Sequence, residues 1–273
     1  MENTNEDQII LIDKPAGISS FGVVAKVRRK LRDEFGHKIK VGHTGTLDPF
    51  ATGLLILLSG KMTKKSNEFL KLDKEYIAEL KLGFTSSTGD PEGEITEVIF
   101  SKHGEVFSKK KPNDSRVSEK QIQHFSVEGL PEVTTVRRRR SVALDEGASP
   151  VTTGASDPSP KRKDVEFVLK KFIGKIEQTP PRFSAIKING QRAYKLARKG
   201  EDFEIPSRKV TIYNLEILEY DYPKLTIRCE VSSGTYIRTL AEDIGKALNT
   251  GAYLTALRRT KIANYDVSDA SVL

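Results

Sequence analysis

The sequence predicts an α+β fold, because segments with strand and helix periodicity are mixed without regular alternation. Strand-like alternation is clearest over 76–84, where apolar residues recur at every second position. Helical spacing is clearest over 23–35, and no internal repeat is visible. A chain of 273 residues is long enough to bury a substantial core in one large domain or two small ones.

Near the N-terminus the sequence predicts a short buried strand followed by a helix. Residues 8–13 are mostly apolar and end at the Lys14-Pro15 turn. Ser19 or Ser20 can cap the helix, because a serine oxygen accepts a hydrogen bond from a backbone N–H of the first turn. The buried stripe of this helix would comprise Val23, Val24, Val27, Leu31 and Phe35.

Two further strands flank a second helix. The apolar run 53–58 predicts a buried strand, and residues 61–72 predict a helix. The alternation over 76–84 predicts a strand with one face toward the core. Tyr76 is therefore expected on one face of a sheet.

The middle of the chain is polar and contains a long basic insert. Residues 118–121 fit a capping box that opens a short helix. Residues 131–163 hold a run of four arginines and a stretch rich in Ser, Thr, Gly and Pro, which cannot support a core. We expect this insert to be disordered and order to resume where Asp164 caps a helix over 165–173.

The C-terminal part returns to regular structure. Asn189-Gly190 predicts a hairpin turn, and residues 208–231 predict two alternating strands. A helix is expected over 235–248 and an apolar, basic closing segment over 252–265.

Composition excludes several classes of protein. Hydrophobic residues make up 37% and charged residues 30%, and no apolar run approaches the ~20 residues that cross a bilayer. The start of the chain is polar and acidic, unlike a signal peptide, so we expect a cytoplasmic protein. A single cysteine, Cys229, excludes an intramolecular disulfide, and four scattered histidines argue against a zinc site.

The net charge favours a polyanionic partner. Lys and Arg outnumber Asp and Glu by 45 to 37, which gives +8 at pH 7. A solvated basic surface would produce the same count, so charge alone does not identify nucleic acid as the partner.

The most informative motif places one carboxylate at the tip of a turn. Asp48 lies in the run Gly-Thr-Leu-Asp-Pro-Phe-Ala-Thr (45–52), directly before the predicted buried strand. Pro49 removes a backbone donor and biases Asp48 toward an extended conformation. Taken alone, an Asp-Pro pair also fits an ordinary Asx turn.

Several segments together resemble the TruB-type tRNA pseudouridine synthases. The most specific is Gly-His-Thr-Gly-Thr-Leu-Asp-Pro-Phe-Ala-Thr-Gly-Leu-Leu (42–55). The resemblance covers about residues 9–100 and 165–267, in the family's order. The other matching segments are Asp-Lys-Pro-Ala-Gly-Ile-Ser-Ser (13–20), Lys-Glu-Tyr-Ile-Ala (74–78), Pro-Pro-Arg-Phe-Ser-Ala-Ile-Lys (180–187), Ser-Ser-Gly-Thr-Tyr-Ile-Arg-Thr-Leu (232–240) and Leu-Arg-Arg-Thr (257–260).

The resemblance implies a fold, a reaction and a substrate. It implies the pseudouridine synthase fold, a mixed central sheet with flanking helices and a catalytic cleft. The implied reaction is isomerisation of uridine 55 in the T arm of tRNA to pseudouridine, with neither metal nor cofactor. We expect a monomer.

The resemblance also implies a domain layout. We expect a flexible N-terminus (1–8), one catalytic domain (9–267) interrupted by the insert 131–163, and a short tail (268–273). The family's bacterial members usually continue into a C-terminal RNA-binding PUA domain, which we do not expect here.

The resemblance assigns roles to eight residues. Asp48 would be the nucleophile, toward C1′ of the sugar or C6 of the base, with Arg238 as its ion-pair partner. Tyr76 would stack on the target ring and assist removal of the C5 proton. His43 would pack against RNA bases, Tyr236 and Leu257 would line the uracil pocket, and Lys14 and Lys64 would meet phosphates. Each of these side chains also has an ordinary structural or solvated interpretation.

Two other functions compete with isomerisation. A non-catalytic RNA-binding or RNA-folding protein would share the basic charge but would not need Asp48, Tyr76 and Arg238 together. A glycosidase-like hydrolase needs a carboxylate pair. The nearest acids, Asp90 and Glu92, lie in a Gly-Asp-Pro-Glu-Gly turn that we interpret as structural.

Overall fold

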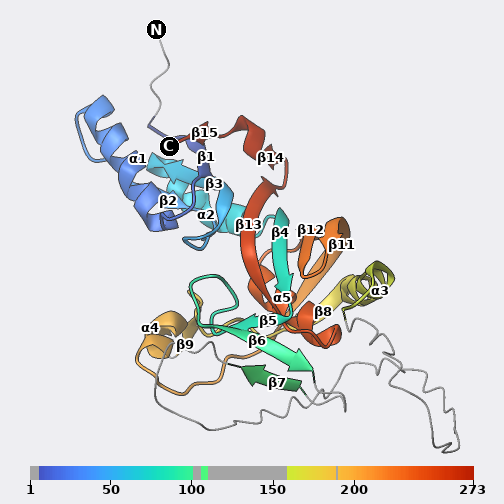
Figure 1. The fold of residues 1–273 in the computed structure, drawn as a ribbon. Helices are drawn as coiled ribbons and strands as arrows, with labels where there is room; N and C mark the ends of the chain where they lie inside the picture. The colour runs from blue at the N-terminus through green and yellow to red at the C-terminus, as the bar shows by residue number, and fades with distance from the viewer. Residues whose placement is uncertain (1–5, 101–105, 110–158, 189) are drawn as a thin grey trace, which may run out of the picture.

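A long mixed sheet runs through the molecule (Figure 1). The computed structural model describes residues 6–100, 106–109, 159–188 and 190–273, and within these residues ten strands form this sheet. They are β1 (Ile9–Lys14), β2 (Val41–His43), β3 (Thr52–Ser59), β4 (Lys74–Leu82), β8 (Gly174–Gln178), β11 (Arg208–Asp221), β12 (Lys224–Val231), β13 (Ala252–Ile262), β14 (Tyr265–Asp266) and β15 (Ser271–Val272).

The strand order is not the chain order. The path runs β15-β1-β3-β13-β4-β12-β11-β8, with β2 paired to β3 and β14 paired to β13. The pairs β1–β15 and β3–β13 are parallel, and the other pairs are antiparallel. The expected α+β class with a mixed sheet is confirmed.

Smaller elements complete the described chain. One small antiparallel sheet consists of β5 (Phe84–Ser86), β6 (Ile95–Phe100) and β7 (Val106–Lys109). Another consists of β9 (Lys187–Ile188) and β10 (Gln191–Arg192). The helices are α1 (Ser20–Phe35), η1 (Gly60–Lys65, a 3₁₀ helix), α2 (Ser66–Leu70), α3 (Arg162–Phe172), α4 (Ala193–Arg198), α5 (Ile237–Ala247) and η2 (Val267–Asp269, a 3₁₀ helix).

Strand β3 is buried on both faces, which explains its unbroken apolar sequence. Leu55 and Leu57 pack with the apolar stripe of α1. Leu54, Ile56 and Leu58 face the opposite side, against Phe69 and Ile262. The strand therefore anchors the end of the loop that carries Asp48.

Strand β4 alternates as its sequence predicts. Tyr76, Ala78, Leu80 and Leu82 are all buried, and they share one core cluster with residues of α3 and α5. In Figure 1, α5 lies behind β13 and β4, and α3 lies beside β11. This face of the sheet supports the first turn of α5, where Arg238 lies.

The predicted caps and turns are mostly confirmed. Ser19 caps α1, since its side chain accepts a hydrogen bond from Gly22 N at 3.1 Å. The expected helix 61–72 is a 3₁₀ turn followed by a short α-helix. Strands β9 and β10 pair antiparallel, as the hairpin signal predicted.

Three boundaries differ from expectation. Helix α3 begins at Arg162, and Asp164 is its third residue, accepting a hydrogen bond from Lys161 N at 2.9 Å. Residues 6–8, expected as part of a flexible N-terminus, are bonded to Ser59 and Lys61. Residues 268–273, expected as a tail, include β15, which pairs with β1. The helix predicted at 118–121 and most of the insert 131–163 lie outside the described residues.

Within the described residues, no helix is long and apolar enough to cross a membrane.

Gly53 is predicted to be essential to the packing of β3 against β13. Its φ is +101°, and a Cβ there would lie 2.2 Å from the carbonyl oxygen of Arg259. Gly53→Ala should lower the free energy of unfolding by roughly 3 kcal/mol or more, from backbone strain plus overpacking. Denaturant unfolding measures this change.

Gly36 provides the matched control, since its φ is +76° and a Cβ added there would have no neighbour within 4 Å. Gly36→Ala should cost only about 1–2 kcal/mol of backbone strain. Equal losses in the two variants would contradict the close approach at Gly53.

Candidate active site

Asp48 lies in the loop that joins β2 to β3, and this loop is fixed from three directions. Ser20 Oγ donates to Leu47 O at 2.9 Å and accepts from Leu47 N at 2.8 Å. Lys14 Nζ donates to Pro49 O at 3.2 Å, and Arg259 Nη2 donates to Gly45 O at 3.1 Å. The loop is therefore held to α1, β1 and β13 at once.

The loop leaves only part of Asp48 open to solvent. Leu47 and Ala51 are buried in the core on either side of it. The Asp48 side chain itself is 33% exposed. A rigid frame thus presents one carboxylate at the surface, as the motif predicted.

Arg238 is buried, and its guanidinium contacts two carboxylates and two backbone carbonyls. Its Nε lies 3.1 Å from Asp48 Oδ2, and its Nη2 donates to Asp48 Oδ1 at 3.5 Å. Nη1 donates to Asp90 Oδ2 at 3.1 Å and to Thr88 O at 3.0 Å, and Nη2 also donates to Phe183 O at 2.8 Å. The expected pairing of Asp48 with Arg238 is confirmed.

Asp90 belongs to this network, which the sequence did not reveal. We interpreted it as part of a structural turn, and it does accept hydrogen bonds from Thr88 Oγ1 at 2.5 Å and Glu92 N at 3.0 Å. Its second oxygen pairs with Arg238, and its side chain is only 5% exposed. Since Asp90 and Arg238 are separated by 148 residues, only the folded chain shows the contact.

Burial and the nearby positive charges act in opposite directions on the pKa of Asp48. Burial raises the pKa of Asp48 above its ordinary value of 3.8, and this outweighs the lowering by the charge of Arg238. Asp90 raises the pKa further, whereas Lys14 lowers it.

Tyr76 is buried on β4, between β12 and β13. It pairs with Cys229 on one side and Arg259 on the other. It shares a core cluster with Leu47, the neighbour of Asp48, and with Leu257 on β13. The fold thus brings Tyr76, Leu257 and the Asp48 loop to the same part of the sheet.

His43 lies on β2, five residues before Asp48. Burial lowers the pKa of His43, and the nearby charge of Arg259 lowers it further, so the ring is neutral at pH 7. Its Nδ1 is buried and has no hydrogen-bond partner among the described residues.

Tyr236 directly precedes α5 and is tied to β8. Its backbone N donates to Gln178 Oε1 at 2.8 Å, and Gln178 Nε2 donates to its carbonyl at 3.1 Å. Tyr236 is thus held two residues before Arg238.

The two lysines expected at phosphates have different environments. Lys14 is fully buried and donates to the carbonyls of Pro15 and Ile18, each at 2.8 Å, as well as to Pro49. Burial lowers the pKa of Lys14 to about 8. Lys64 is exposed on η1. Lys14 therefore braces the Asp48 loop, whereas Lys64 is accessible to a phosphate.

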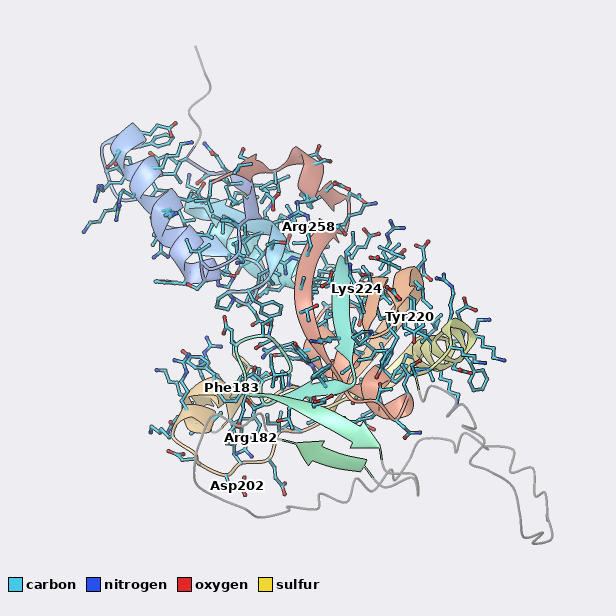
Figure 2. All side chains as sticks on the ribbon, viewed as in Figure 1. Arg182, Phe183, Asp202, Tyr220, Lys224 and Arg258 are labelled. Atoms are coloured by element: carbon cyan, nitrogen blue, oxygen red, sulfur yellow. The ribbon has the colours of Figure 1, made fainter. Side chains whose placement is uncertain are left out.

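The adjacent arginines of the 257–260 motif have separate roles. Arg258 Nη2 pairs with Asp13 at 2.7 Å and joins the upper part of β13 to β1 (Figure 2). Arg259 is 1% exposed and bonds Leu54 O and Gly45 O. Figure 2 shows Phe183 in the lower part of the molecule, away from Arg258.

A pocket of about 470 Å³ adjoins the segments that bind Arg238. Its walls include Thr88 and Phe183, whose carbonyls bind the guanidinium, but none of the eight expected site residues. Among the described residues, no group of three or more His, Cys, Asp or Glu could hold a metal ion.

Comparison with known families identifies the family of this chain. Residues 28–125 and 133–237 match the N-terminal domain of the TruB family pseudouridylate synthases. The chain belongs to the TruB family. Residues 238–273 match a second model, the tRNA pseudouridylate synthase B C-terminal domain. The TruB chain is therefore a pseudouridine synthase, an isomerase.

Curated relatives extend the match over nearly the whole chain. A tRNA pseudouridine synthase B of Phocaeicola vulgatus is 39% identical over 98% of this chain and 90% of its own length. A tRNA pseudouridine synthase B of Parabacteroides distasonis is 41% identical over 93% of this chain and 85% of its own length. A solved chain of a Cbf5-Nop10-Gar1 complex is 24% identical, with a TM-score of 0.58, and the match covers 98% of this chain and 53% of that one. At this identity the likeness concerns the fold, and it confirms the pseudouridine synthase fold.

Lys14→Met should weaken the fold, because it leaves the buried carbonyls of Pro15, Ile18 and Pro49 without their donor. We expect the free energy of unfolding to fall by at least about 2 kcal/mol. The salt dependence of RNA binding should stay unchanged. Lys64→Met is the matched control: it should leave stability unchanged and, if Lys64 meets a phosphate, reduce the slope of log K against log salt by about 1.

Denaturant unfolding and RNA titrations at several salt concentrations measure both effects. A Lys14→Met variant that unfolds like the wild type but shows the shallower slope would contradict the bracing role.

Proposed function

We propose that this TruB chain converts uridine 55 in the T arm of tRNA to pseudouridine, with Asp48 as the nucleophile. The observation that carries the proposal is the unequal exposure of the two carboxylates on Arg238. Asp90 is 5% exposed and serves the network, whereas Asp48 is 33% exposed and can reach a substrate. The names of the curated relatives support tRNA as the substrate.

The reaction rearranges bonds within one nucleotide and needs no net gain or loss of atoms. The bond from C1′ to N1 breaks, the base turns, and a bond from C1′ to C5 forms. The C5 proton is then removed while N1 gains a proton. Asp48 attacks either C1′ of the sugar or C6 of the base, and its carboxylate must be ionised in both cases.

The target base must leave its stack before it can reach Asp48. Tyr76 would stack on the flipped ring and assist removal of the C5 proton. His43, as a neutral ring, can pack against neighbouring bases without a charge. Tyr236 and Leu257 would line the uracil pocket, and the exposed Lys64 would contact the phosphate backbone.

Arg238 has two functions in this proposal. Its bidentate contact fixes the direction of the Asp48 carboxylate, and its charge favours the ionised form against the effect of burial. A protein that only bound RNA would not need a partly exposed carboxylate that is oriented by a buried arginine.

Asp48→Asn tests the proposal. It keeps the shape of the side chain and removes the nucleophilic charge, so turnover should fall by more than about 10³-fold while tRNA binding stays within about threefold. Carbodiimide labelling of a tRNA transcript detects the product, which has the same mass as uridine.

Asp33→Asn is the control, because Asp33 is an exposed acid on α1. This change should alter neither turnover nor tRNA binding. If the turnover of Asp48→Asn stays within tenfold of the wild-type value, Asp48 is not the nucleophile. Normal tRNA binding by a wild-type chain that makes no pseudouridine would favour the RNA-binding alternative.

The pH dependence of kcat/KM should show an acid limb set by Asp48. Its pKa is raised, so the reactive carboxylate is lost as the pH falls through a value above 3.8. We expect activity to decline at a higher pH than an ordinary aspartate would produce, in a range where circular dichroism shows a folded protein. An acid limb at or below pH 3.8 would contradict the raised pKa.

A further inference from the structure

Arg208, the first residue of β11, packs on the ring of Tyr236. Its guanidinium carbon lies 4.6 Å from the ring centroid, within the range of a cation–π contact. Its Nη2 also donates a hydrogen bond to the carbonyl of Gly234, two residues before Tyr236. The same guanidinium therefore contacts both the ring and the turn that carries it.

Gln178 fixes the backbone of the same tyrosine. It lies opposite Arg208 in the pairing of β8 with β11, and both its amide oxygen and its amide nitrogen bond Tyr236. Gln178 is 1% exposed. Backbone and ring of Tyr236 are thus held by two neighbouring residues on adjacent strands.

The arrangement at Arg208 is not the one that would best stabilise the fold. Its Nε is buried and has no hydrogen-bond partner among the described residues. An unpaired buried donor opposes folding. The stacked geometry is kept despite this cost, which indicates a role for the ring position itself.

We propose that Arg208 is a positioning residue that orients Tyr236 for the target base. The guanidinium covers one face of the Tyr236 ring, so a flipped uracil can contact only the other face. Arg208 thereby acts on the position of the base through Tyr236. This inference rests on the proposed function, in which Tyr236 lines the uracil pocket.

Direct binding of an RNA phosphate by Arg208 is the competing role. Only the positioning role depends on the ring of Tyr236. A positioning residue should lose its effect when the ring is absent. A phosphate contact should raise the dissociation constant and reduce the salt slope, whether or not the ring is present.

The test is a double-mutant cycle with Arg208→Met and Tyr236→Leu. We expect Arg208→Met to lower the single-turnover rate at saturating tRNA by about tenfold, because a misplaced base reacts slowly. The dissociation constant for tRNA should change by less than about threefold, and in the Tyr236→Leu background the same change should have almost no effect.

Arg198→Met is the matched control, because Arg198 on α4 also lies over a tyrosine, Tyr194, at 5.7 Å. Its single-turnover rate should equal that of the wild type. Equal rate losses for Arg208→Met with and without the Tyr236 ring, or a loss confined to affinity, would overturn the inference.

Two measurements separate this inference from the proposed function. Thermal unfolding of the four cycle proteins without RNA reports whether the contact exists, and wild-type product formation reports the reaction. An inactive wild type would overturn the proposed function and with it the role in base orientation. An active wild type with an equally active Arg208→Met would overturn only the role of Arg208.

Should Arg208→Met unfold below the assay temperature, Arg208→Lys replaces it in the cycle. Lysine keeps a charge and a donor but loses the planar surface. Its single-turnover rate should again fall with affinity preserved, and a wild-type rate would overturn the inference.

Discussion

The site depends on the ion pairs that the buried guanidinium of Arg238 makes with Asp48 and Asp90. The guanidinium joins Asp48, 190 residues away, to Asp90, 148 residues away, and adds two backbone carbonyls. A charge that is 5% exposed must be compensated, so the segments that supply these acceptors have to reach their places together. The core around α5 and the candidate active site therefore share one buried network of charges and hydrogen bonds.

The Asp48 carboxylate works against the stability of the fold. Because folding raises the pKa of Asp48, the folded state favours its protonated form. The resulting penalty is absent below the ordinary pKa of 3.8 and is complete once the pH exceeds the raised value. At neutral pH the loop carries this cost, and the contacts of Lys14, Ser20 and Arg259 hold it in place.

Residues whose environment is local were predictable from the sequence. The alternation that buries Tyr76, the serine cap of α1 and the apolar β3 all follow from short-range patterns. The placement of Asp48 at a turn also followed from its neighbours, and the family resemblance supplied its partner Arg238.

Residues whose environment depends on distant segments were not predictable in the same way. Asp90 forms an ordinary turn, and its second oxygen shows its role only when Arg238 arrives from 148 residues away. Lys14 looks like a surface lysine in the sequence, yet the chain folds over it and supplies three carbonyls.

The pKa of Asp48, followed by carboxyl-carbon NMR in the wild type and in Arg238→Gln, tests the central claim most directly. Asp48→Asn identifies the signal. The account predicts a wild-type pKa above 3.8 and a higher one in Arg238→Gln, because burial raises it and the arginine lowers it. A wild-type pKa at or below 3.8, or equal values in the two folded proteins, would contradict it.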